Sequence, residues 1–273
     1  MDIVFKSIEL EPLANIMPSE INGRDIIWVC NRLCKPDSPS WAGFMSITSR
    51  SEPKSSSIVT MLPIIDLNAS DPNSLFSLLS FIVEQCHKYN IPETAVTFDQ
   101  PLFIKAFEIV HAESMPIFVR LGGFHQLMSF LGSIGYIMEG SGLREALECV
   151  YAPVSVGHML SGKAYARAVR GHLMISSALL SIILEPHLNT LSADELQKVL
   201  NLDVPDELTF DTELGALFQF LDDEKQRLKS CSRTTALWLQ YIDYVSLVQD
   251  FVRAERTSDW PLSKSSCLHT KDA

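Results

Sequence analysis

The feature that most constrains the fold is a regular alternation of apolar segments between residues 58 and 141. Three of these segments have the β-branched, apolar character of buried strands: 58–65, 94–98 and 116–121. The segments that follow them carry apolar residues at helical spacing. Alternation of strands and helices favours parallel strands joined by right-handed crossovers. The sequence therefore predicts an α/β core over residues 58–141, with a short, mostly parallel sheet.

The regions on either side of this core have different patterns. Residues 1–57 mix short apolar runs with Pro, Ser and Asn, and we expect an irregular N-terminal segment. Residues 142–256 show only helical patterns and predict a mainly α-helical region. Residues 257–273 are polar, and we expect them to form a disordered tail.

Two helix boundaries in the C-terminal half carry local signals. Ser192 and Glu195 have the spacing of a capping box, which predicts the start of a helix. A longer helix is expected from Ser161 to Leu184, because Pro186 disfavours continuation.

Composition and charge restrict the class of protein. The chain has 273 residues, of which 47% are hydrophobic and 20% charged, so it can form a sizeable core. Its net charge of -11 argues against a surface that coats nucleic acid generally. The chain start lacks a secretory signal, its six cysteines are dispersed, and its longest apolar run, 173–184, is short and serine-rich. We expect an intracellular protein of the nucleus or cytoplasm that is neither secreted nor inserted in a membrane.

Polar side chains follow the predicted strands at Asp66, Asp99 and His125. Ligands of parallel sheets bind at the carboxyl ends of strands, so we expect these three residues at one sheet edge. Carboxylates held there can bind divalent cations that activate water, which makes Asp99 and Asp66 candidate metal ligands. A histidine at this place can bind a metal or polarise a phosphate.

Each of these residues also has a structural interpretation. Asp99 stands before Pro101 and can cap the helix that begins there. Asp66 fits a turn that leads into the next helix. His125 follows Gly122 and Gly123 and can tie that turn to a neighbouring carbonyl group. The sequence leaves both interpretations open for all three residues.

A second candidate site is a set of basic residues: Lys163, Arg167 and Arg170 have the spacing of one helix face. Such a stripe can contact the phosphates of a nucleic acid, and its structural alternative is a solvated helix face. His158 and His172 lie in the same region without the spacing of metal ligands. For both histidines we expect a solvent-exposed or helix-capping role.

The stretch 119–143 holds six of the twelve glycines, yet it matches no phosphate-binding motif. We interpret the cluster as turns and close packing, since Gly132 and Gly135 fall within one predicted helix and weaken it unless another element approaches closely. Cys30 and Cys34 lack a second pair of ligands, so they predict no zinc site. No motif indicates a small-molecule cofactor.

Several stretches together resemble a largely uncharacterised family of animal proteins that recur in many genomic copies and are similar to products of mobile elements. The resemblance spans about residues 25–262 and rests on these stretches: SWAGFMS (40–46), MLPIIDLNASD (61–71), VTFDQPLFIKAFEIV (96–110), RLGGFHQLMSFLGSIGYIMEGSGLREAL (120–147), HMLSGKAYARAVRGHL (158–173) and TALWLQYIDYVSLVQDFVRAERTSDWPL (235–262). Their central order is also similar to the ribonuclease-H-like core of some DNA transposases.

The resemblance implies an incomplete ribonuclease-H-like core followed by a helical region. Asp99 would match the second catalytic acid, and His125 the histidine that opens the next helix. An intact relative would use Mg²⁺ or Mn²⁺ and act on DNA. Relatives carry a further strand motif before the start of this chain and continue past Trp260, so this chain resembles an internal fragment. Because Asp99 alone cannot form a two-metal site, we expect a truncated, inactive relic that has no cofactor of its own.

Two other functions stay open at this point. The helices within 207–256 could form a non-enzymatic interaction module that binds a protein partner through an exposed apolar stripe. A hydrolase of another class would use His125 with a partner residue that no motif identifies.

Overall fold

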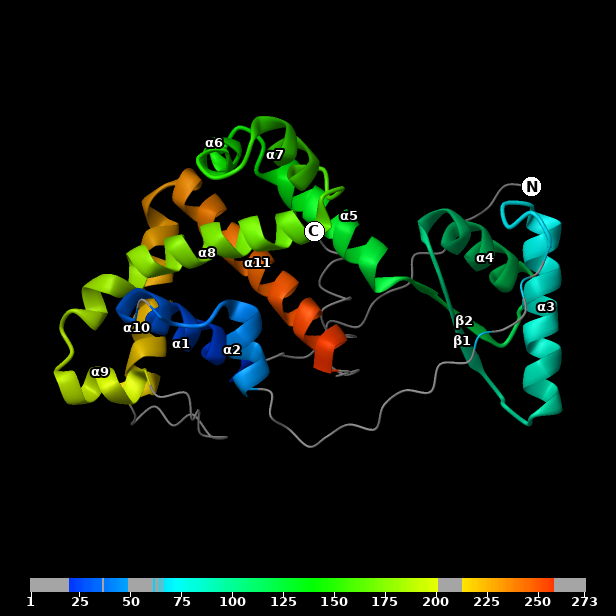
Figure 1. The fold of residues 1–273 in the computed structure, drawn as a ribbon, viewed down its shortest axis with the longest axis horizontal. Coiled ribbons are helices and arrows are strands. Elements are labelled where there is room, and N and C mark those ends of the chain that lie inside the picture. The colour runs from blue at the N-terminus through cyan, green and yellow to red at the C-terminus, as the bar shows by residue number, and fades with distance from the viewer. Residues whose placement is uncertain are drawn as a thin grey trace. The chain divides into compact units, whose positions relative to one another are not determined.

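The computed structural model describes residues 20–35, 37–48, 61, 64, 66–200 and 213–257. The chain divides into two compact units, the first formed by Met1–Ser49 and Ser177–Ile242 and the second by Arg50–Ser176 and Asp243–Ala273. The fold is mostly helical, with one small parallel sheet in the second unit (Figure 1). The expected α/β class is therefore confirmed only as a two-stranded parallel sheet within a mainly helical protein.

The sheet consists of β1 (Thr94–Phe98) and β2 (Ile117–Leu121). The strands run parallel, in a register that pairs Thr94 with Ile117 and Phe98 with Leu121. Helix α4 (Gln100–Ala112) connects them as the predicted crossover. Two of the three predicted strands are thus confirmed.

The third predicted strand, 58–65, lies outside the described residues except for Met61 and Ile64. Neither of these two residues is in a strand, and their side chains are exposed. Asp66, which follows them, is also exposed and lies outside any helix or strand. Among the described residues, the sheet therefore has fewer strands than the sequence predicts.

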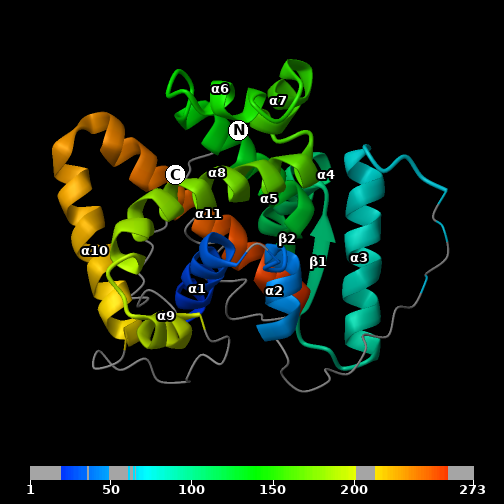
Figure 2. The ribbon, with the colours of Figure 1, turned by 60° about the vertical axis from the view of Figure 1, so that its left-hand side comes forward.

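One face of the sheet is covered by α3 (Pro72–Lys88) and α4, which contact each other and lie beside the strands in both views (Figures 1 and 2). Ile117 and Val119 of β2 are buried toward these helices, whereas Phe118 between them is exposed. Successive side chains of a strand point to opposite faces of the sheet, so buried and exposed residues alternate when one face is covered. The buried centre of the cluster comprises Leu75, Leu79, Ala106, Ile117 and Val119.

The other helices of the second unit begin directly after the sheet. They are α5 (Gly123–Ile137), α6 (Leu143–Glu148), α7 (Pro153–Leu160) and the first part of α8 (Tyr165–Leu188). The last part of α11 (Arg233–Thr257), from Asp243 onward, also belongs to this unit. Helices α5 and α7 pack so closely that a Cβ atom at Gly135 would overlap the backbone of Leu160. The interpretation of the glycine-rich stretch as close packing is confirmed at this position.

Helix α8 differs from its predicted bounds at both ends. It begins at Tyr165, after Lys163, and it continues through Pro186 to Leu188. A proline so near the end of a helix removes few backbone hydrogen bonds, so the helix can continue past it. In this last turn the ring of His187 stacks on the ring of Phe220, with ring centroids 4.5 Å apart. By length and composition alone α8 could cross a membrane, a property that it shares with core helices of soluble proteins.

The prediction of an irregular segment over residues 1–57 is wrong for two stretches, which form α1 (Glu20–Cys34) and α2 (Trp41–Thr48); residues 1–19 and 49–57 lie outside the described residues. Two indole groups hold this helical pair together. Trp28 donates from Nε1 to the carbonyl oxygen of Pro39 over 3.0 Å. Trp41 donates from Nε1 to Oδ1 of Asp25 over 2.8 Å. Helices stabilised by contacts with each other show weaker local signals than amphipathic helices with strong caps.

The first unit also contains α9 (Ala193–Val199) and α10 (Glu213–Cys231), which contact each other. Ser192 and Glu195 form the predicted capping box at the start of α9, since each side chain bonds to the backbone N–H of the other. Helix α11 (Arg233–Thr257) follows α10 after a short corner.

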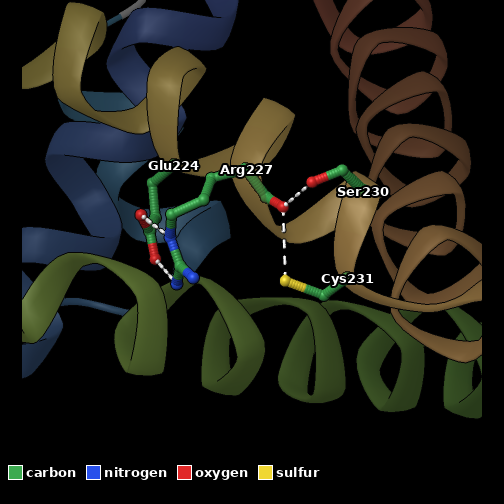
Figure 3. Close-up of polar contacts among 4 residues, drawn as sticks. All are labelled: Glu224, Arg227, Ser230 and Cys231. Atoms are coloured by element: carbon green, nitrogen blue, oxygen red, sulfur yellow. Dashed lines mark hydrogen bonds and ion pairs between the residues drawn. The ribbon is translucent and has the colours of Figure 1, made fainter.

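Side-chain contacts fix the end of α10 (Figure 3). Ser230 donates from Oγ to the carbonyl oxygen of Arg227 over 2.7 Å, and Cys231 contacts the same oxygen through Sγ. The guanidinium group of Arg227 donates to both carboxylate oxygens of Glu224, which lowers the pKa of that carboxyl group. Ser232 then accepts from the backbone N–H of Thr235 at the start of α11. These contacts explain the corner as helix capping.

Candidate functional site

The carboxyl ends of β1 and β2 form the edge where the sequence places its candidate residues. The backbone N–H of Gly122 donates to the carbonyl oxygen of Phe98 over 2.8 Å, which extends the ladder to the last residue of β1. Asp99 follows β1 directly, and His125 lies in the first turn of α5 after β2. Parallel pairing therefore brings the chain positions of Asp99 and His125 to the same edge.

Asp99 is the N-cap of α4. Its Oδ1 accepts a hydrogen bond from the backbone N–H of Leu102 over 3.1 Å, and its backbone is extended, with φ −70° and ψ 172°. The residue is exposed. Pro101 occupies the first turn, where a missing N–H has little effect. Of the two interpretations left open by the sequence, the helix cap is the one that these contacts directly support.

His125 is half-buried, and its ring lies edge-on against the ring of Phe124, with centroids 5.6 Å apart. Its Cδ2 atom would lie 3.9 Å from a Cβ atom built on Gly122, so the ring stands over the turn after β2. Asp99 and His125 make neither a hydrogen bond nor an ion pair with each other in the described part of the chain. The two residues therefore share an edge without a direct contact between their side chains in the described part of the chain.

A carboxylate that the sequence did not indicate also lies beside this edge. Glu255 of α11 accepts a hydrogen bond from Nη2 of Arg120 over 2.8 Å. Its carboxyl carbon would lie 3.2 Å from a Cβ atom built on Gly123, the first residue of α5. Because Arg120 and Glu255 are 135 positions apart, no local pattern could have revealed this contact.

These residues do not provide a donor set for a divalent metal. Within the described ranges, no group of three His, Cys, Asp or Glu side chains is placed to hold an ion. One oxygen of Asp99 already accepts from the backbone, and Glu255 is paired with a guanidinium group. Asp66 is exposed and is the N-cap of no helix, whereas Asp71 is the N-cap of α3 and its pKa is lowered mainly by the hydrogen bond from the N–H of Ser74.

The basic residues lie at the surface near the start of α8. Lys163, Arg167 and Arg170 are all exposed. Arg167 donates from Nη1 to Oγ of Ser155 over 3.0 Å, and Arg170 donates from Nε to the carbonyl oxygen of Ala166 over 3.1 Å. The sequence contains no Asp or Glu between 149 and 184, so this surface is locally basic in an acidic chain. Both the phosphate-binding and the solvated-face interpretations agree with this exposure.

The expected exposed or capping role is wrong for His172. His158 is exposed, but the ring of His172 is fully buried, and burial lowers its pKa to about 4. The neighbouring Gly171 lies so close to α6 and α7 that a Cβ atom there would meet Met159 and Leu147. Helix α8 therefore turns this part of its surface toward the core.

The two remaining candidates from the sequence, the cysteines of α1 and the apolar stripe of the C-terminal helices, form no candidate site in the described residues. Cys30 is buried, which raises the pKa of its thiol to about 12, and it shares α1 with Cys34. Residues 213–257 expose no large apolar side chain, so the apolar stripe expected there is not found, and 207–212 lie outside the described residues.

The capping role of Asp99 predicts a specific pattern of stability. Asp99→Ala is expected to lower the free energy of unfolding by about 1 kcal/mol, because the N–H of Leu102 loses its acceptor. Asp99→Asn should stay close to the wild type, since asparagine is an equally good N-cap. Urea denaturation followed by circular dichroism measures both. Equal stability of all three proteins would show that the cap contributes nothing.

Comparison with known proteins gives one match. The model of a protein family described as a domain of unknown function, DUF8702, matches residues 40–267. No curated protein and no solved structure matches the chain.

Proposed function

The chain belongs to the DUF8702 family of domains of unknown function, and we propose that it is a catalytically inactive relic of a DNA-processing enzyme of the ribonuclease-H-like, transposase type. The observation that carries the proposal is the order of elements at the sheet edge. Asp99 directly follows a parallel strand, a crossover helix leads to a second parallel strand, and His125 lies in the first turn of the helix after it.

The contacts of the acidic residues support the proposal that the protein is catalytically inactive. An enzyme of this type needs two or three carboxylates that converge on divalent cations. Here Asp99 serves as a helix cap and Glu255 pairs with Arg120, and the described residues contain no cluster that fits Mg²⁺ or Mn²⁺. The metal ion and the DNA substrate belong to an intact relative.

The exposed cations near the start of α8 are where an intact relative would contact DNA. Lys163, Arg167 and Arg170 lie in a stretch without acidic residues, so phosphates could approach them without repulsion. The alternative of an interaction module in the C-terminal helices gains no support from residues 213–257, whose large apolar side chains are buried or half-buried.

Titration with Mn²⁺, followed by the electron paramagnetic resonance signal of the free ion, tests the proposal. We expect weak binding that is equal in the wild type and in Asp99→Ala, because the carboxylates of an acidic surface attract cations without forming a site. Asp99→Asn serves as a control that keeps the helix cap but removes the charge. A saturable site in the wild type that both variants lose would contradict the proposal.

A further inference from the structure

Two segments of the second unit that contain no acidic residue pack against each other. They are 114–138, which includes β2 and α5, and 149–176, which includes α7 and the first part of α8. Close contacts along α5 bring them together: a Cβ atom at Gly135 would overlap the carbonyl oxygen of Leu160, and one at Gly162 would overlap that of Met128. A chain with a net charge of -11 therefore contains a surface whose own segments do not repel phosphate groups.

A pair of aromatic rings lies where the start of α8 meets the start of α5. Phe124, in the first turn of α5, is exposed by 54%. Tyr165, the first residue of α8, is half-buried, and its ring centroid lies 5.1 Å from that of Phe124. Contacts with Tyr165 and with the edge of His125 hold the Phe124 ring in place while about half of it stays open. A ring that is both fixed and exposed can stack on another planar group.

Cations flank this aromatic pair along the chain. Lys163 precedes Tyr165 by two residues and Arg167 follows it by two, and both cationic side chains are exposed. Arg167 uses one N–H for its hydrogen bond to Ser155, and a guanidinium group has five such donors. The carboxylate of Glu255, which approaches the start of α5, is paired with the guanidinium group of Arg120. The charge beside the two rings is therefore positive.

We propose that this surface binds single-stranded nucleic acid, with an unpaired base stacked on Phe124 and the phosphates of the strand beside Lys163 and Arg167. Exposed aromatic rings with neighbouring cations are the groups that bind a single strand without regard to its sequence. In a duplex the faces of each base are covered by the neighbouring base pairs, so a protein ring reaches them only after unstacking. The surface therefore favours a single strand over a duplex.

The small number of cations limits the strength of this binding and makes it depend on salt. Each phosphate that Lys163, Arg167 or Arg170 neutralises releases counterions, which contributes a slope of about -0.7 to a plot of log K against log salt concentration. Three such contacts give a slope of about -2, so the complex forms at low salt. The inference rests on the proposed function in its choice of cations, but it assigns a binding activity to this chain itself, and that activity needs no metal.

Fluorescence anisotropy of a labelled oligothymidine of about 15 nucleotides, at about 50 mM salt with EDTA, measures the binding. The whole chain is expected to bind this strand more tightly than a duplex of the same length. Phe124→Leu keeps an apolar side chain against Tyr165 but removes the stacking ring, and it should weaken binding at least about fivefold. Phe124→Trp keeps an aromatic ring and should bind like the wild type. Tyr136→Leu, at an α5 residue exposed by 80%, is the matched control that should change nothing.

Lys163→Gln adds a second test that leaves the aromatic contacts in place, and it should make the salt slope shallower by about 0.7. Thermal melting of each variant checks that the fold is intact. A wild type that does not bind the strand at low salt would overturn the inference and leave the proposal of an inactive enzyme standing. Equal affinity for strand and duplex, or wild-type affinity in Phe124→Leu, would show that no base stacks on Phe124. A saturable Mn²⁺ site would contradict the proposed function without changing the binding measured in EDTA.

Discussion

Gly135→Ala is expected to destabilise the protein by at least about 3 kcal/mol, which lowers the melting temperature by roughly 10 °C. Glycine to alanine inside a helix ordinarily stabilises by up to about 1 kcal/mol. At Gly135 the sign reverses, because the new methyl group would overlap the carbonyl group of Leu160 at the end of α7. Backbone atoms cannot turn aside as a flexible side chain can, so α5 and α7 would have to separate.

Gly157→Ala is the matched control for this prediction. Gly157 also lies within a helix, α7, and a Cβ atom there would have no neighbour within 4 Å. This variant should be as stable as the wild type or slightly more stable. Thermal melting of the three proteins by circular dichroism makes the comparison. If Gly135→Ala and Gly157→Ala melted at the same temperature, the close contact of α5 with α7 would be wrong.

The second large effect is the dependence of stability on pH through His172. Burial lowers the pKa of His172 to about 4 in the folded protein, from an ordinary value of 6.5. Between these values the unfolded chain binds a proton that the folded chain does not, so stability falls as the pH decreases. The stabilisation is complete above about pH 6.5, and the loss approaches about 3 kcal/mol as the pH nears 4.

Urea denaturation at a series of pH values from about 7 to about 4 measures this loss, with His172→Gln as the control. The variant cannot titrate in this range, and it shares all other histidines and carboxyl groups with the wild type. The difference between the two proteins isolates His172. We expect the free energy of unfolding of the wild type to fall more steeply than that of the variant. Parallel curves would show that His172 is not buried as a neutral ring.

The crossover from β1 to β2 could be predicted because its signals are local. The segments 94–98 and 116–121 are short, apolar and rich in β-branched residues, and Pro101 marks the start of the helix between them. The same local chemistry predicted that Asp99 could cap α4 and that Ser192 and Glu195 could form a capping box. Interactions within a few residues of the chain can be read from sequence.

The features that could not be predicted depend on distant parts of the chain. Helix α2 is joined to α1 by the hydrogen bond from Trp41 to Asp25, and Trp28 of α1 bonds to Pro39 in the loop between the two helices. The contact of Arg120 with Glu255 spans 135 positions. The burial of His172 depends on which face of α8 meets α6 and α7. Periodicity shows that a helix has an apolar face, but it does not show what packs against that face.

Asp99 caps α4, and we propose that it takes part in no DNA cleavage. The most direct test is an assay of supercoiled plasmid nicking with the whole chain in Mn²⁺, in which the wild type is compared with Asp99→Asn, the variant that keeps the helix cap. We expect the same background level of nicking for both proteins. The opposite result would be nicking by the wild type that is lost in Asp99→Asn while the fold of the variant stays intact. That result would show an active metal site and contradict the proposal that the protein is inactive.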